Sequence, residues 1–175
     1  MTRKYDVKPT GVERFFDENE LIVSKTDTKG LITYANDIFL RIAGYHEDEL
    51  IGQPHNLIRH PDMPRAVFGL LWDQIAAGNE IFAYVVNMAK NGDHYWVLAH
   101  VTPSYDTQGR IVGYHSNRRV PARSAIEAIK PIYAQLLTEE NRHSSPTTAI
   151  EASTQLLINT LQASNVSYDE FVFSL

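Results

Sequence analysis

Two short runs of apolar and β-branched residues near the start of the chain predict a β-hairpin. The runs are residues 21–26 and 31–34, and residues 27–30 between them are of the kinds that form tight turns. Residues 1–19 show no clear hydrophobic period, although 12–16 have the spacing of one short amphipathic turn. We therefore expect a flexible N-terminal cap followed by the hairpin.

The next part of the chain predicts several short helices and one longer helix. Asn36 and Asp37 can cap a helix over residues 38–43, and Gly44 suits the left-handed position that ends it. Residues 46–52 predict another brief helix, and three prolines then interrupt the chain. From 65 to 77 apolar residues recur at spacings of three and four, which is typical of a helix with one buried face.

Three further β-rich runs follow, at residues 81–88, 95–102 and 111–117. The Asn91-Gly92 pair lies between the first two, and Asn-Gly in this position is a strong hairpin signal. The order of elements predicts an α+β fold with a five-stranded antiparallel sheet and short helices on one side. A hollow is expected between the sheet and these helices.

Beyond Pro121 the spacing predicts two amphipathic helices, over residues 124–137 and 147–163. Pro131 lies inside the first and predicts a kink. Their apolar stripes need cover, which can come from each other, from a second copy of the chain or from a separate target.

Composition removes several classes of function. The 43% hydrophobic and 21% charged residues are typical of a folded globular protein, and no apolar run approaches the roughly 18 to 20 residues of a membrane span, so a cytoplasmic location is expected. A net charge of -5 gives no reason to bind nucleic acid. The absence of cysteine excludes thiolate metal sites and iron–sulfur clusters. No Walker loop or His-Glu-x-x-His motif is present, so we expect a protein that is not an enzyme.

Several strings carry a family resemblance. Residues 34–37, the pair Gly44-Tyr45 and residues 49–54, together with the order of elements, resemble a PAS domain. Residues 54–64 and 90–97 resemble the aerotaxis-receptor branch of that family. The resemblance implies a PAS sensor domain over residues 20–121, between the N-terminal cap over 1–19 and a C-terminal helical signalling or dimerisation segment over 122–175.

The same resemblance implies a function. Aerotaxis receptors hold FAD non-covalently in this domain and report its redox state to a chemotaxis signalling domain. The chain has no room for that domain or for a membrane anchor, so a stand-alone sensor is expected. Its partner would be a separate chemotaxis transducer or another signalling protein, and a homodimer is expected.

The matching motifs carry the cofactor-linked positions onto Asn36, Arg59, His60, Asp62 and Asn87. Two donors and a carboxylate within residues 59–62 suit a flavin, which has a pyrophosphate and an acceptor-rich ring edge. The alternative is a loop-fixing network of Arg59 with Asp62. For Asn36 the alternative is helix capping alone.

Trp72, Phe82 and His115 complete the candidate cofactor-binding residues. Trp72 follows Phe68 by one helical turn and can wall the pocket, although large rings usually serve packing. Relatives often carry a tryptophan at the start of the first long strand, whereas here Phe82 is the aromatic residue. His115 can respond to the cofactor and is also the iron ligand that a haem b alternative requires.

Two alternatives of another kind remain open. One is a cofactor-free interaction module, with the pocket filled by Ile81, Phe82 and Tyr84. The other is a sensor of an organic acid or similar metabolite near Arg59. No metal site is expected, because His94 and His100 would lie roughly 20 Å apart along one strand.

Overall fold

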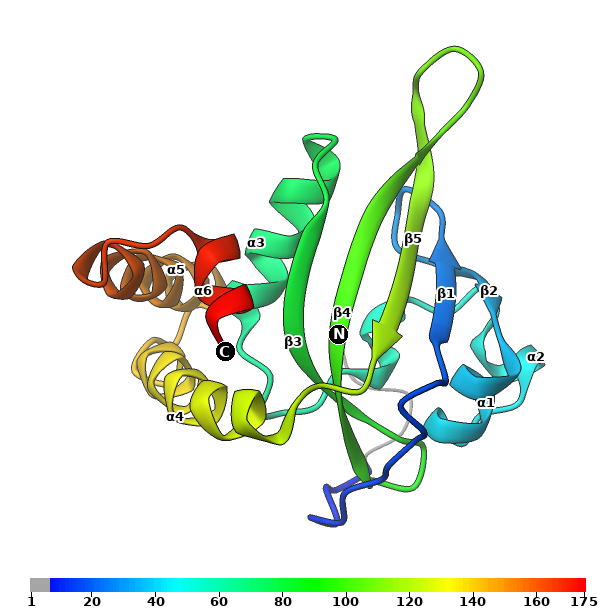
Figure 1. The fold of residues 1–175 in the computed structure, drawn as a ribbon, viewed down its shortest axis with the longest axis horizontal. Coiled ribbons are helices and arrows are strands. Elements are labelled where there is room, and N and C mark those ends of the chain that lie inside the picture. The colour runs from blue at the N-terminus through cyan, green and yellow to red at the C-terminus, as the bar shows by residue number, and fades with distance from the viewer. Residues whose placement is uncertain (1–6) are drawn as a thin grey trace.

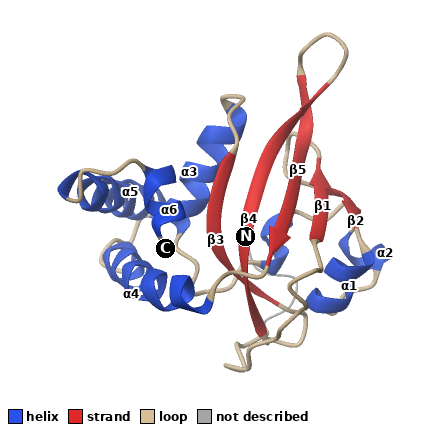
Figure 2. Ribbon diagram, viewed as in Figure 1, coloured by secondary structure: helices blue, strands red, loops and turns tan. Residues whose placement is uncertain are grey.

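A five-stranded antiparallel sheet forms the centre of the computed structural model, which describes residues 7–175 (Figures 1 and 2). The first six residues of the expected N-terminal cap lie outside the described residues. The strands lie in the order β2-β1-β5-β4-β3, which confirms the predicted α+β architecture. Their bounds are β1 (Ile22–Thr26), β2 (Ile32–Ala35), β3 (Ile81–Met88), β4 (His94–Tyr105) and β5 (Ile111–Arg119).

The predicted β1–β2 hairpin is held by its turn residues. The Asp27 carboxylate accepts hydrogen bonds from the backbone N–H groups of Lys29 and Leu31, both at 2.9 Å. Gly30 has a φ of 79°, a left-handed conformation that few other residues adopt without strain. The turn therefore fixes the register of the hairpin.

Short helices cover one face of the sheet, which we call the inner face. They are α1 (Asp37–Ala43), α2 (Glu47–Leu50), the 3-10 helix η1 (His55–Ile58) and the longer α3 (Arg65–Ala76). As predicted, the Asn36 side chain caps α1 by accepting from the N–H of Phe39, and Gly44 ends the helix with a φ of 73°. The apolar face of α3 buries Val67, Leu71 and Ile75.

Three C-terminal helices gather beside α3 and β3 (Figure 1). They are α4 (Arg123–Glu140), α5 (Pro146–Ala163) and α6 (Tyr168–Ser174). The helices α4 and α5 pack against each other, α5 packs against α3, and α6 packs against β3. Much of their apolar surface is thus covered within the chain. No helix in residues 7–175, these three included, is long and apolar enough to cross a membrane.

Two details of this C-terminal part go beyond the prediction of a helix that contains Pro131. The helix α4 continues through Pro131, and the Tyr133 hydroxyl donates to the backbone carbonyl of Tyr84 on β3. The helix α6 was not expected. It begins with a capping box, in which Ser167 and Glu170 each bond the backbone of the other, and this spacing is a recognisable helix-start signal.

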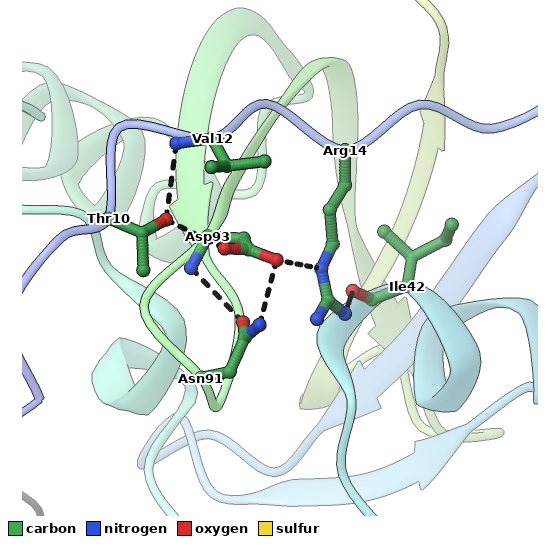
Figure 3. Close-up of polar contacts among 6 residues, drawn as sticks. All are labelled: Thr10, Val12, Arg14, Ile42, Asn91 and Asp93. Atoms are coloured by element: carbon green, nitrogen blue, oxygen red, sulfur yellow. Dashed lines mark hydrogen bonds and ion pairs between the residues drawn. The ribbon is translucent and has the colours of Figure 1, made fainter.

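The described part of the N-terminal cap lies extended along the start of β4 (Figure 3). The amphipathic turn expected at residues 12–16 is wrong, because Glu13 forms a parallel bridge with His94 and the backbone bonds of this segment go to β4. Asp93 ties the segment down by accepting from Thr10 Oγ1 at 2.7 Å and from Arg14 Nε at 2.9 Å. Arg14 also donates to the carbonyl of Ile42.

Candidate ligand-binding site

A cavity of about 490 Å³ lies between the inner face of the sheet and α3. Because side chains alternate along a strand, every second residue of β3, β4 and β5 points toward it, among them Asn87, Ala99 and Arg118. Phe68 and Trp72 of α3 face it from the other side. The predicted hollow is therefore present, and its size falls within the roughly 300 to 1,000 Å³ of small-molecule sites.

The charge of the cavity wall has one sign. The described residues that line it include four basic side chains and no Asp or Glu; the basic residues are Lys29, Arg59, Arg65 and Arg118. A wall of this kind attracts an anionic or acceptor-rich ligand.

Arg118 is the most deeply buried of these cations, with an exposed fraction of 2%. Its Nε donates to Ser116 Oγ at 3.1 Å and its Nη2 donates to Ser24 Oγ, while Nη1 is buried with no hydrogen-bond partner among the described residues. Burial lowers the pKa of Arg118 to about 10, so it remains charged at neutral pH. A buried donor left unsatisfied is costly, and a ligand acceptor in the cavity would satisfy it.

His55 of η1 is the uncharged partner of this arginine. Its Nε2 lies 3.3 Å from Arg118 Nη2 and 3.2 Å from Ser24 Oγ. Burial, and then the positive charge of Arg118, lower the pKa of His55 to about 3. His55 is therefore neutral at physiological pH and adds no second charge beside the guanidinium.

Aromatic rings form the wall near α3. Trp72 meets Tyr114 of β5 edge to face, with ring centres 5.5 Å apart, and is 37% exposed. The guanidinium carbon of Arg59 lies 5.7 Å from the centre of the Phe68 ring. A planar ring system would thus meet both apolar faces and cations here.

Three of the eight sequence-predicted residues line this cavity: Arg59, Trp72 and Asn87. Arg59 and Asn87 come together because their backbones form an isolated antiparallel bridge at the free edge of β3. Two residues 28 positions apart in sequence therefore share one wall.

The same bridge separates His60 and Asp62 from the cavity. Successive residues of an extended segment point to opposite faces, so Arg59 faces inward and His60 faces outward. His60 and Asp62 line a second cavity of about 480 Å³, between the outer face of the sheet and α4. There the Asp62 N–H donates to His60 Nδ1 at 3.1 Å, and the His60 and His94 rings lie 5.7 Å apart.

The remaining three predicted residues do not line the inner cavity. The side chain of Asn36 makes three hydrogen bonds to the backbone. Its Oδ1 accepts from the N–H groups of Val23 and Phe39, and its Nδ2 donates to the carbonyl of Leu21. Phe82 lies on the outer face, stacked on His100 with ring centres 4.1 Å apart. His115 alternates with the inward-facing Tyr114 and Ser116 and so points to the outer face as well.

Sequence reasoning missed the polar cluster of Ser24, His55, Ser116 and Arg118. Strand alternation contained the signal, because Arg118 shares its face with Tyr114 and Ser116 in a strand that packs between two others. A long cation at a buried strand position indicates either an ion pair or a ligand.

Comparison with known proteins agrees with this geometry. Residues 32–118 match the family model described as the PAS fold. The chain is 43% identical over 119 residues to the aerotaxis receptor of Escherichia coli (strain K12), covering 68% of this chain and 23% of that receptor. It is 28% identical over 103 residues to the nitrogen fixation regulatory protein of Klebsiella pneumoniae, covering 59% of this chain and 21% of that protein.

A solved structure gives the same fold. The light-state structure of the blue-light photoreceptor Aureochrome1 LOV superposes with a TM-score of 0.54 at 26% identity, covering 70% of this chain and 91% of that chain. The chain thus spans nearly the whole of that domain but only about a quarter or less of the first two curated relatives. Fold, matched residues and relatives agree, and residues 32–118 of the chain form a domain of the PAS family, similar to that of the aerotaxis receptor.

Proposed function

We propose that this chain is a redox sensor that binds FAD in the inner cavity and passes the redox state to a signalling protein. The observation that carries the proposal is a cavity of about 490 Å³ whose wall holds four cations and no carboxylate. The resemblance to aerotaxis receptors supports FAD as the ligand, since residues 54–64 and 90–97 match that branch and the chain is 43% identical to the Escherichia coli receptor over 119 residues.

The side chains of the cavity fit the chemistry of a flavin dinucleotide. Arg118 has a buried donor without a protein partner, which suits the acceptor-rich edge of a flavin ring. Lys29, Arg59 and Arg65 put three positive charges on the cavity wall, and cations bind the phosphate oxygens of a pyrophosphate through charge-assisted hydrogen bonds. Asn87 brings an amide that can both donate and accept.

A bound flavin would supply a ring that gains electrons, and with them negative charge, on reduction. Arg118 would stabilise that negative charge, and His55, being neutral, would not repel the guanidinium beside it. The chain contains no cysteine, so no thiol can bond to the ring. The amide of Asn87 on β3 would change its hydrogen bonds when the ring is reduced, and so pass the change to the sheet.

The partner is expected to be a polypeptide that contacts the C-terminal helices or the outer face of the sheet. A chemotaxis transducer or another signalling protein fits this role, and a homodimer is a second expected association. The proposal assigns the chain no catalytic step.

The residues on which two competing interpretations relied do not line the cavity. The haem alternative relied on His115, which points to the outer face. The cofactor-free alternative relied on Ile81, Phe82 and Tyr84 filling the pocket. Phe82 stacks on His100 on the outer face, and Tyr84 shares that side of the strand. Ile81 is buried in a cluster with Leu71 and Ile75. None of the three residues lines the cavity.

The test is to purify the full chain, record its absorption spectrum and identify any released small molecule by mass spectrometry after denaturation. FAD should be released, and added FAD should raise the melting temperature of ligand-free protein, because a ligand that binds only the native state stabilises it. Release of FMN, haem or an organic acid in place of FAD would overturn the assignment. So would a colourless protein whose melting temperature does not respond to FAD.

A further inference from the structure

One residue of the cavity wall comes from outside the PAS domain. Ile150, on α5, lines the cavity together with residues of β1, β3, β4, β5 and α3. The match to the PAS family ends at residue 118, so the wall is completed by a segment that the family model does not include. The helix α5 begins only at Pro146, which places Ile150 in its first two turns.

The position of Ile150 depends on a close approach between α5 and α3. A Cβ atom added to Gly69 of α3 would lie 3.7 Å from Ile150 Cγ2, which is ordinary van der Waals contact. The Ile150 side chain therefore lies directly over Gly69 of α3, next to the cavity. Ala149, beside it in sequence, is buried with an exposed fraction of 2%.

A second contact joins the C-terminal helices to the same wall. Pro64, the N-cap of α3, gives no side-chain hydrogen bond to the helix. Glu140, in the last turn of α4 and 7% exposed, accepts from the N–H of Ala66 at 3.1 Å through its Oε1. A carboxylate is favourable at a helix N-terminus, so α4 supplies the cap that α3 lacks.

We infer that α5 is part of the ligand site and that FAD binding and the docking of α5 on α3 stabilise each other. The inference rests on the proposed function. Contact between the ligand and Ile150 exists only while α5 is docked, so a ligand in the cavity favours the docked helix. By thermodynamic linkage, the factor by which docked α5 raises the affinity for FAD equals the factor by which bound FAD raises the equilibrium constant for α5 docking. Loss of the Ile150 contact lowers both by the same factor. The C-terminal helices then respond to the cavity directly, without a relay through the sheet.

The experiment compares hydrogen exchange of the full chain with and without added FAD, in the wild type, Ile150→Ala and Ile158→Ala. Ile158 lies on the same helix, is 40% exposed and does not line the cavity, so its replacement removes the same atoms away from the site. FAD should slow the exchange of α5 amides several-fold in the wild type and in Ile158→Ala. In Ile150→Ala the protection should be lost and the Kd for FAD should rise about tenfold.

The outcomes separate the two proposals. If FAD binds to the wild type and α5 exchanges at the same rate with and without it, the inference is overturned and the proposed function stands. If FAD does not bind, both fall. A purely structural role of Ile150 would raise α5 exchange equally with and without FAD and leave the Kd unchanged, which also overturns the inference. Ile150→Val, which removes one methylene, covers the case in which the alanine variant does not fold and should show a smaller effect of the same sign.

Discussion

The guanidinium carbon of Arg118 lies 4.6 Å from the centre of the Phe39 ring. Its other contacts are two serine hydroxyls and a neutral histidine, and none of the ion pairs among the described residues includes it. This buried cation therefore has no anionic partner among the described residues, and an acceptor on a bound ligand would supply one.

Replacement of this arginine tests that role. Arg118→Gln keeps a donor but removes the charge, and should raise the Kd for FAD about 10- to 100-fold, the usual cost of a lost charged hydrogen bond. Fluorescence titration with FAD measures the change. Arg119→Gln is the matched control, because Arg119 is adjacent, exposed and on the outer face. An equal loss in both variants would contradict a specific contact of Arg118 with the ligand.

The depressed pKa of His55 predicts a pH dependence of stability. The unfolded chain binds a proton at His55 below a pKa of about 6.5, whereas the folded protein does so only near 3. The stabilisation is therefore present above pH 6.5 and is lost as the pH falls toward 3. Between pH 7 and pH 5 the wild type should lose about 2 kcal/mol of unfolding free energy through this residue.

Urea denaturation of His55→Gln at the two pH values checks this expectation. The variant should lose less stability than the wild type over the interval, because glutamine does not titrate. Other groups, including His115 with its lowered pKa, contribute equally to both proteins. Parallel pH profiles for variant and wild type would show that His55 is protonated in the folded state.

Asp93 should control the docking of the N-terminal segment. Hydrogen bonds from Thr10, Asn91 and Arg14 lower the pKa of Asp93 to about 2, so its contribution is present above pH 3.8 and is lost toward pH 2. In Asp93→Asn the amides of Thr10 and Arg14, which bond Gly92 and His94, should exchange faster. Asp106→Asn is the control, since Asp106 binds its own turn between β4 and β5. Unchanged exchange in Asp93→Asn would refute the anchoring role.

Two glycines of the cavity wall should respond oppositely to alanine. Gly69 lies inside α3, where alanine is favoured by about 1 kcal/mol over glycine, and the added Cβ meets Ile150 at 3.7 Å. Gly69→Ala should therefore raise the free energy of unfolding by up to about 1 kcal/mol. Gly30→Ala should lower it, because a Cβ there lies 2.9 Å from Trp72 and the backbone is left-handed. Thermal or urea unfolding of both variants measures the changes, and a loss of stability in Gly69→Ala would contradict the prediction for α3.

Much of the fold follows from local sequence signals. The hairpin turn at Asp27, the cap at Asn36 and the end of α1 at Gly44 each depend on neighbouring residues only, and each is as predicted. The capping box of Ser167 and Glu170 is equally local, so α6 could have been predicted from the same rules.

The site could be predicted only in part, because it depends on which face each residue occupies. Arg59 and His60 are neighbours in sequence but line different cavities, and the bridge between Arg59 and Asn87 decides which is which. For Arg118 the only local signal is strand alternation. Its place in the site depends on its burial beside His55, which is 63 positions away in sequence. The contribution of Ile150 requires the docking of α5 on α3, which periodicity alone does not specify.

The segment that runs from α2 to Arg59 occupies the borders of the sheet at both ends. Ile32 on β2 exchanges backbone hydrogen bonds with Gln53 and Gly52, and Asn87 on β3 bridges Arg59. Another polypeptide could add a strand beside either residue only after this segment is displaced, which would open the inner cavity to solvent. Extension of the sheet into a larger assembly and retention of a ligand are thus mutually exclusive at these two points, which directs any lasting association toward the helices and the outer face.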